Sequence, residues 1–165
     1  DLTMAIIQLR KPAASEADDL TELALTSKAY WDYDDEFIYA CRDELTQTPE
    51  QINSSNFVYE VAELNGKLAG FYKLDVSGNL DLDLAGDLEL DCLYVLPFAI
   101  GQGVGKSLFT AMINQANNLD AKTISIQADP NAEAFYQHLG AKTVGQRESG
   151  SIPGRFLPLM QIDLV

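Results

Sequence analysis

Residues 93–107 read LYVLPFAIGQGVGKS, and this stretch decides the fold. An apolar strand expected from Leu88 to Val95 ends here, and glycines at 101, 103 and 105 lead into an amphipathic helix. A glycine-rich turn that opens a helix aims backbone N–H groups and the positive end of the helix dipole at one spot. The stretch therefore predicts a diphosphate-binding turn, with a turn that only packs strand against helix as the alternative.

Two other glycine motifs compete for this turn, and each fails at one position. The P-loop pattern G-x-x-x-x-G-K-[ST] fits Gly105, Lys106 and Ser107 but needs a glycine where Ile100 stands. Too little chain follows Ser107 for the strand–helix units that come after a P-loop. The dinucleotide pattern G-x-G-x-x-G, begun at Gly101, meets Lys106 where its last glycine belongs. A P-loop phosphotransferase and a dinucleotide-binding enzyme are therefore both disfavoured.

The elements expected on either side of the turn follow the order βααβββαβαββ. Strands are expected at residues 5–9, 57–64, 68–74, 88–95, 123–128, 142–145 and 157–165. Helices are expected from a capping box at Ser15 and at residues 34–45, 104–116 and 131–139. Asn65-Gly66 is a strong hairpin signal between two of the strands. Hairpins followed by strand–helix alternation predict an α/β (α+β) fold: a central mixed sheet with helices on both faces.

Composition excludes several classes of function. The 165 residues are 47% hydrophobic and 22% charged, which predicts one folded domain over residues 1–165. Eleven Lys and Arg against 25 Asp and Glu give a net charge of -14, the wrong sign for nucleic acid or an anionic membrane surface. No apolar stretch is long enough to span a bilayer, and no signal peptide is visible. Because Cys41 and Cys92 form no secreted-type framework, we expect a reducing, cytoplasmic compartment.

A second, distant segment gives the glycine turn a specific interpretation. Residues 131–141 read NAEAFYQHLGA, and together with residues 93–97 and 100–105 they resemble signatures of the GNAT superfamily of acyl-CoA-dependent N-acetyltransferases. The signatures occur in the family's order and cover most of the chain. The resemblance implies the GNAT fold and acetyl-CoA as co-substrate. Ile100 departs from the family's Gln or Arg, which leaves the diphosphate to backbone donors.

The resemblance also places the acetyl-CoA site. The strand around residues 93–95 is expected to splay from its parallel neighbour at 123–128, with the pantetheine arm in the gap. Asn131 is expected to cap the following helix. No metal site is expected, because His138 lacks Cys or carboxylate ligands at metal spacing. The expected cofactor-binding residues are Leu93, Tyr94, Val95, Gly101, Gln102, Gly103, Val104, Gly105, Lys106 and Asn131.

The strand before the turn changes its phase by one residue. Leu88, Leu90 and Cys92 are apolar in one phase, and Leu93 and Val95 continue in the other. Such a slip is typical of a β-bulge, which releases backbone groups and redirects side chains. A strand buried on both faces is the alternative interpretation.

Acetyl transfer to an amine needs a base, since only about one alkylammonium in a thousand is deprotonated at pH 7. Asp87, Glu89 and Asp91 alternate with leucines and so share one face of the strand. Glu89 is the first choice, because many members of the resembled family place a general-base glutamate six residues before the position of Val95. Asp91 is the second choice, and a solvated acidic face is the alternative interpretation.

Tyr136 matches the general-acid tyrosine of the resembled family. In that role its phenol would protonate the departing thiolate of CoA. By its sequence alone, the Phe135-Tyr136 pair equally predicts core packing.

Acidic residues gather at residues 32–44 and 75–91. The resemblance places the first helices and the loop at 148–156 around the acceptor. We therefore expect a small cationic amine or a basic peptide as acceptor, with solubility as the alternative role of the charge. A homodimer is an expectation of the resemblance alone. The second functional hypothesis is a non-catalytic acyl-CoA sensor of the same fold.

Overall fold

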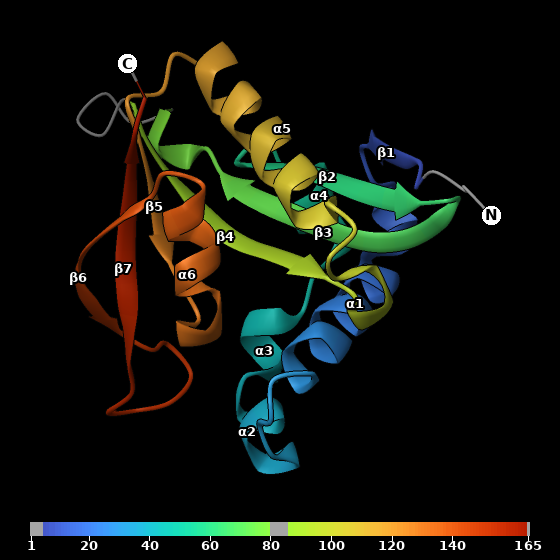
Figure 1. The fold of residues 1–165 in the computed structure, drawn as a ribbon, viewed down its shortest axis with the longest axis horizontal. Coiled ribbons are helices and arrows are strands. Elements are labelled where there is room, and N and C mark those ends of the chain that lie inside the picture. The colour runs from blue at the N-terminus through green and yellow to red at the C-terminus, as the bar shows by residue number, and fades with distance from the viewer. Residues whose placement is uncertain (1–4, 80–85, 165) are drawn as a thin grey trace.

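The computed structural model describes residues 5–79 and 86–164. Within these residues, seven strands form one sheet in the order β1-β2-β3-β4-β5-β7-β6 (Figure 1). β4 and β5 are parallel and the other neighbouring pairs are antiparallel, so the sheet is mixed, as predicted. The strands are β1 (Ile7–Arg10), β2 (Phe57–Leu64), β3 (Lys67–Asp75), β4 (Asp87–Val95), β5 (Thr123–Gln127), β6 (Lys142–Glu148) and β7 (Phe156–Asp163).

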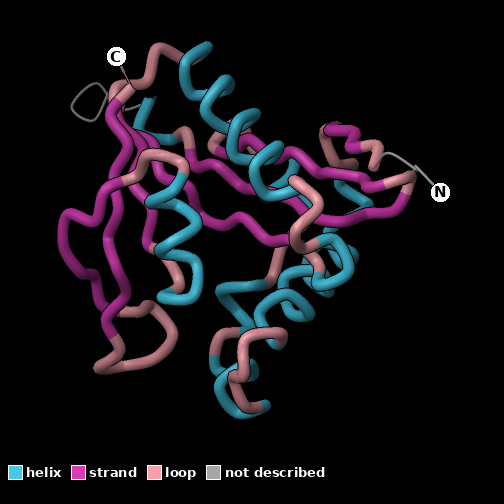
Figure 2. The backbone as a smooth tube through the Cα atoms, in the orientation of Figure 1, coloured by secondary structure: helices cyan, strands magenta, loops and turns pink. Residues whose placement is uncertain are grey.

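Helices cover both faces of this sheet (Figure 2). The helices are α1 (Ala17–Ala29), α2 (Asp35–Ala40), α3 (Arg42–Leu45), α4 (Pro49–Asn53), α5 (Val104–Asn118) and α6 (Glu133–His138). Leu108 and Met112 of α5 are fully buried in the core on one face. Leu20 of α1 and Leu45 of α3 belong to a second core on the opposite face. The predicted arrangement of a mixed sheet between two helical layers is confirmed.

The N-terminal helices differ in detail from the prediction. Ser15 does not cap α1, because it lies inside a short 3-10 turn, Ala14–Glu16, that precedes the helix. The carboxylate of Glu16 accepts a hydrogen bond from the N–H of Ala13 at 2.8 Å at the start of this turn. The expected helix at 34–45 is divided at Cys41, whose N–H bonds back to the carbonyls of Phe37 and Ile38 in a tight turn. α4 was not predicted, although a capping box at Thr48 marks its start.

The Asn65-Gly66 hairpin is confirmed. Both residues have positive φ values, 52° and 84°, and they join β2 to β3 with Leu64 opposite Lys67. This backbone twist matches that of the flanking strands, which is why Asn-Gly is favoured at such turns. The hairpin lies between β1 and β4 in the sheet, and its strand β3 pairs with β4.

The predicted bulge in β4 is also confirmed. Cys92 lies opposite Lys73 and Leu90 lies opposite Leu74, so Asp91 is an extra residue without a partner in β3. The bulge reverses which residues face which core. Leu90 before the bulge and Leu93 after it both pack on the α5 side of the sheet.

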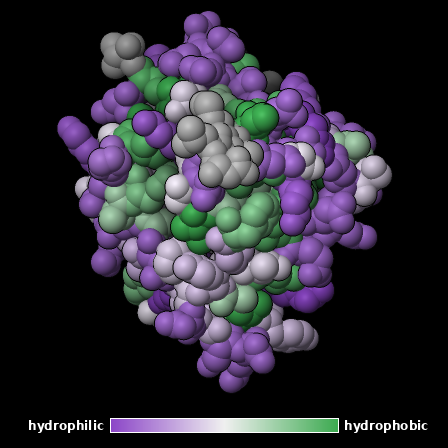
Figure 3. Space-filling model, turned by 45° about the vertical axis from the view of Figure 1, so that its right-hand side comes forward, coloured by the Kyte–Doolittle hydropathy of each residue, from purple (hydrophilic) through white to green (hydrophobic). Residues whose placement is uncertain are grey.

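One face of the molecule is largely polar. In the orientation of Figure 3, hydrophilic side chains surround smaller apolar patches. Among the described residues, no helix combines the length and apolar character needed to cross a membrane.

Candidate active site

β4 and β5 pair over four residues and then separate (Figure 1). Their register runs from Asp87 opposite Thr123 to Leu90 opposite Ile126. Beyond that point β4 stays paired with β3 as far as Val95, while β5 stays paired with β7. The separation begins at the bulged residue Asp91, where the ladder is already disrupted. The predicted splay of the two strands is confirmed.

A cavity of about 520 Å³ lies in the gap, a size typical of small-molecule sites. Its wall continues from the glycine turn along β4 and α6 to α1, α3 and the loop before β7. Two of the predicted site residues, Gln102 and Glu89, are not part of this wall. The predicted residues that line it are Asp91, Leu93, Tyr94, Val95, Gly101, Gly103, Val104, Gly105, Lys106, Asn131 and Tyr136.

The glycine turn presents the N-terminus of α5 to the cavity. Gly103 has a φ of 88°, a left-handed conformation that a side chain would strain. The N–H groups of Val104, Gly105 and Lys106 lie in the first turn of α5, so they have no hydrogen-bond acceptors within the helix. Together with the helix dipole and the Lys106 ammonium, these donors fit a diphosphate.

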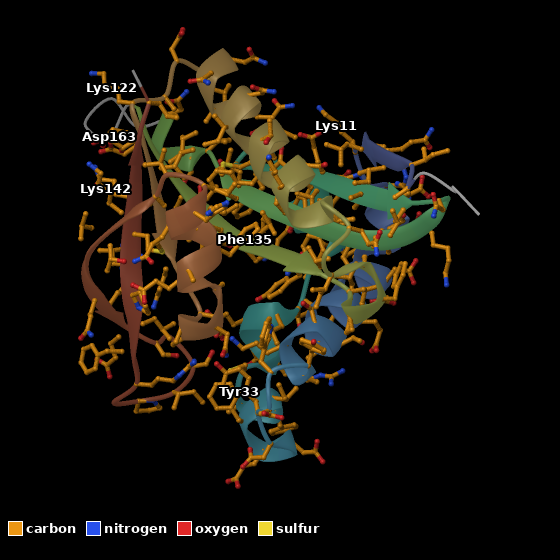
Figure 4. The ribbon with its side chains drawn as sticks, in the orientation of Figure 1. Lys11, Tyr33, Lys122, Phe135, Lys142 and Asp163 are labelled. Atoms are coloured by element: carbon orange, nitrogen blue, oxygen red, sulfur yellow. The ribbon has the colours of Figure 1, made fainter. Side chains whose placement is uncertain are left out.

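The absence of a side chain at Gly105 lets α6 pack closely against this turn. A Cβ at Gly105 would stand 3.1 Å from Cζ of Phe135 and 3.6 Å from Cγ2 of Val95. Figure 4 labels Phe135 on α6, the helix that also carries Tyr136. The glycine therefore brings α6, and with it the candidate acid, close to the helix N-terminus.

The two candidate bases have different surroundings. Asp91 lines the cavity, and its side chain is 30% exposed with one oxygen 3.7 Å from Nζ of Lys73. Burial raises the pKa of Asp91 to about 6, with Lys73 opposing part of the rise. The Glu89 carboxylate lies away from the cavity wall and is paired with the Arg147 guanidinium at 2.8 Å. The structure thus places Asp91, the second choice from the sequence, at the cavity.

Tyr136 is buried, and its ring packs against Phe109 and Phe135 with centroids 6.1 and 5.2 Å away. The hydrogen bonds among the described residues do not include its hydroxyl. Every fully buried side-chain oxygen among those residues has a hydrogen-bond partner. The Tyr136 hydroxyl has none among them, so it is not fully buried, and Tyr136 lines the cavity. The hydroxyl is therefore accessible from the cavity. Burial raises the pKa of Tyr136 above its ordinary value, so the phenol keeps its proton at neutral pH.

Asp129 caps the 3-10 turn that leads into α6, so the prediction that Asn131 is the helix cap is wrong. Oδ1 of Asp129 accepts the backbone N–H of Asn131 at 2.9 Å, ahead of the 3-10 turn that leads into α6. Asp before Pro130 was the available signal, because proline is favoured at the first position after a cap. Asn131 still lines the cavity and donates its side-chain amide to Asp129.

Lys28, Asp129, Asn131 and Arg155 also line the cavity, and of these the sequence predicted only Asn131. Nζ of Lys28 lies 2.6 Å from Oδ2 of Asp129, and the hydroxyl of Tyr33 donates to the same oxygen at 2.8 Å. Nη2 of Arg155 donates to the Tyr33 hydroxyl at 2.9 Å and lies 3.8 Å from Asp129. Figure 4 shows Tyr33 beside α2. We call this group the Asp129 cluster; its members are Lys28, Tyr33, Phe37, Asp129, Asn131 and Arg155.

The described wall of the cavity carries as many cationic as anionic residues, although acidic residues were expected around the acceptor. Of the two acidic stretches, only Glu44 and Asp91 reach the described wall, while Asp81 and Asp83 lie outside the described residues. The other acidic residues of these stretches stay on the outer surface, where local bonds such as Asp34 to the N–H of Phe37 occupy some of them. The charged lining residues are Lys28, Lys106, Arg155, Glu44, Asp91 and Asp129.

In the described residues, no three His, Cys, Asp or Glu side chains are grouped so that they could hold a metal ion.

Comparison with known proteins identifies relatives in both sequence and structure. The family profile described as an acetyltransferase (GNAT) domain matches residues 16–151. A curated relative, the uncharacterized N-acetyltransferase ycf52 of Gracilaria tenuistipitata var. liui, is 48% identical over 40 residues. That match covers 24% of this chain and only 22% of the length of the relative.

Three solved structures share the fold. The PaiA N-acetyltransferase from Thermoplasma acidophilum, in complex with coenzyme A, has a TM-score of 0.76 at 20% identity. The match covers 96% of this chain and 99% of the Thermoplasma chain. A GCN5-related N-acetyltransferase from Rhodopseudomonas palustris has a TM-score of 0.77 at 22% identity, with 99% of both chains covered. A GNAT family acetyltransferase from Brucella melitensis, in complex with acetyl-CoA, has a TM-score of 0.64 at 15% identity. The match covers 97% of this chain and 89% of the Brucella chain.

Proposed function

Since this chain belongs to the GNAT acetyltransferase family, we propose that it transfers an acetyl group from acetyl-CoA to the nitrogen of a primary amine. The observation that carries the proposal is the cavity between the splayed strands. One continuous wall joins the N-terminus of α5, the carboxylate of Asp91 and the phenol of Tyr136. These are an anion site, a base and an acid, which are the three groups that aminolysis of a thioester requires.

The residues at the glycine turn would hold the co-substrate. Acetyl-CoA, when bound, supplies an activated acetyl thioester. The N–H groups of Val104, Gly105 and Lys106 would take its diphosphate, and the Lys106 ammonium would add charge. Backbone groups of Leu93 to Val95 have β3 on one side only, so their free side would bind the pantetheine arm and polarise the thioester carbonyl.

Asp91 is the base that this geometry supports best. An amine reaches the site as an ammonium ion and must lose a proton before it can attack. With a pKa of about 6, Asp91 is ionised at neutral pH and can accept that proton directly or through water. Glu89 becomes the second choice, because its carboxylate is engaged by Arg147 outside the cavity wall.

Tyr136 completes the proposed chemistry as the acid. Its accessible hydroxyl keeps its proton until a thiolate leaves, and it would then donate that proton to the sulfur. Recovery of a proton from solvent through the open cavity would restore the phenol for the next cycle.

Binding of acetyl-CoA should stabilise the protein against heat. At about 100 times its Kd, a ligand that binds only the folded state adds about 2.7 kcal/mol, which for a chain of this size raises Tm by about 5–10 °C. Differential scanning fluorimetry with acetyl-CoA, and with ATP and magnesium as the matched control, checks this. A shift with ATP and none with acetyl-CoA would contradict the proposed function. Binding without turnover on any amine would instead favour the acyl-CoA sensor.

Removing Lys73 should move the pH profile of the reaction. Lys73 opposes the rise in the pKa of Asp91, so Lys73→Met should raise that pKa further, by about one unit or more for a charge at this distance. The active form is the carboxylate, so the fall in kcat on acidification would begin at a higher pH. Lys67→Met on the same strand is the control, because the Lys67 ammonium lies over Phe98. Identical profiles for both variants would remove Lys73 from the account.

A further inference from the structure

We propose that the Asp129 cluster binds a carboxylate on the acceptor, so that the acceptor is a small amino carboxylate that carries its amine and its acid in one molecule. The inference rests on the proposed acetyl transfer and names its substrate class.

The Asp129 cluster has more positive than negative charge. Lys28 and Arg155 are both cationic, and their side chains are only 12% and 20% exposed. The single carboxylate, Asp129, already accepts from Lys28, Tyr33 and Asn131. These bonds hold the pKa of Asp129 below its ordinary value in spite of its burial. Within the cluster the cations outnumber the carboxylates by one, which favours an anion there, although Glu44 on the same cavity wall offsets part of that charge.

The two cations also keep donors for such an anion. In the described part of the chain, the guanidinium of Arg155 donates one hydrogen bond, from Nη2 to Tyr33, and leaves Nε and Nη1 for other partners. Lys28 uses one of its three N–H groups on Asp129. Both side chains line the cavity. A guanidinium edge matches the two oxygens of a carboxylate, a geometry that an ammonium or an amide on the acceptor cannot satisfy.

Aromatic rings hold these cations in place before any acceptor arrives. Tyr33 and Phe37 are stacked with centroids 4.1 Å apart and an interplanar angle of 11°. The guanidinium carbon of Arg155 lies 4.8 Å from the centre of Phe37, and Nζ of Lys28 lies 5.2 Å from the centre of Tyr33. Preorganised donors lose less entropy when they bind a ligand, which suits a recognition site.

The cluster and the base share one small cavity. Leu90 lies opposite Ile126 and β5 ends at Gln127, so Asp129 lies in the loop just beyond the strand, two residues past the level of Asp91. Asp91 and Asp129 both line the cavity of about 520 Å³, a size that suits a small molecule. An amine near Asp91 and a carboxylate at the Asp129 cluster can therefore belong to one short acceptor.

A basic peptide fits the site less well. Its cationic side chains would face Lys28 and Arg155 on the cavity wall, where like charges repel. The cluster thus favours one part of the earlier expectation, a small acceptor with an ammonium group, over the other.

The test compares acceptors that differ in the carboxylate alone. Initial rates at saturating acetyl-CoA would be measured for the twenty L-amino acids, β-alanine and γ-aminobutyrate, and for the amide of each. We expect at least one amino carboxylate with a kcat/KM tenfold or more above that of its own amide. Acetylation of amides, diamines or lysine peptides at equal or higher kcat/KM would overturn the inference and leave acetyl transfer standing. Acetylation of no amine at all would overturn both.

Arg155→Gln separates recognition from chemistry. We expect it to raise the KM for the preferred amino carboxylate tenfold or more and to abolish the preference over the amide, with the KM for acetyl-CoA unchanged. Arg147→Gln, on β6 and outside the cavity wall, should keep the preference. Arg155→Lys should recover part of it through charge alone. An unchanged acid-to-amide ratio in Arg155→Gln would overturn the inference, and the matched pairs on the unaltered protein test it independently of any variant's folding.

Discussion

Asp91→Asn is expected to lower kcat by about a hundredfold to ten-thousandfold at pH 7.5, the range that a positioned general base contributes. The substitution keeps the shape of the side chain in the bulge of β4 and removes its ability to accept a proton. The pH dependence should show the same cause. In the unaltered protein kcat should be constant above the pKa of about 6 and fall as the pH drops through it, because the protonated acid cannot act as a base. The variant should lack this acidic limb.

Glu89→Gln is the matched comparison for that experiment. It removes a carboxylate two residues away on the same strand, outside the cavity wall and paired with Arg147. We expect a change in kcat of less than about threefold and an unaltered acidic limb. The opposite pattern, a slow Glu89 variant and a fast Asp91 variant, would restore Glu89 as the base and refute the assignment made from the cavity.

Tyr136→Phe is expected to lower kcat by about a hundredfold while the KM for acetyl-CoA stays within about threefold. The change removes the phenolic hydroxyl and keeps the ring that packs on Phe109 and Phe135. Because the hydroxyl has no partner among the described residues, Tm should stay within about 2 °C of the parent value. Steady-state kinetics and a melting curve on the same preparation check both.

That pair of measurements decides between the two interpretations of Tyr136. If the residue only packs, phenylalanine replaces it without loss and kcat stays at the parent value. If it is the acid, kcat falls and the loss should be smaller for an acyl donor whose thiol leaves more easily. A large fall in Tm with an unchanged rate would show that the hydroxyl is structural.

Local signals were enough to predict most of the fold. Asn65-Gly66 predicted the central hairpin because few residue pairs adopt two consecutive positive φ values. The phase slip between Cys92 and Leu93 predicted the bulge, since side chains alternate strictly unless a residue is inserted. The glycine turn predicted the start of α5 at the end of β4, and the anion site expected there stays a prediction that rests on the free N–H groups of a helix N-terminus.

The choice of base could not be made from the same signals. Strict alternation of side chains puts Glu89 and Asp91 on the same face of the strand. Asp91 is the bulge residue, and the sequence does not indicate the direction of its side chain. The contact between Asp91 and Lys73 joins β4 to β3, and the pairing of Glu89 with Arg147 joins β4 to β6. Both depend on strand order, which no local pattern specifies.

Apart from Asn131, which was predicted as a cofactor-binding residue, the Asp129 cluster was missed for a related reason. Lys28 and Asp129 are 101 positions apart, and Tyr33 and Arg155 are 122 apart. Each residue taken alone resembles an ordinary surface side chain. Net charge was equally uninformative here, because the acidic residues stay largely outside while cations from three segments line the cavity.

The central claim is that the N-terminus of α5 holds the diphosphate of the co-substrate so that its sulfur end reaches Asp91 and Tyr136. A crystal structure of the protein with CoA tests it most directly. The account predicts diphosphate oxygens within hydrogen-bonding distance of the N–H groups of residues 104–106 and the thiol beside the Tyr136 hydroxyl. A complex with the diphosphate elsewhere, or with the thiol remote from both side chains, would contradict it.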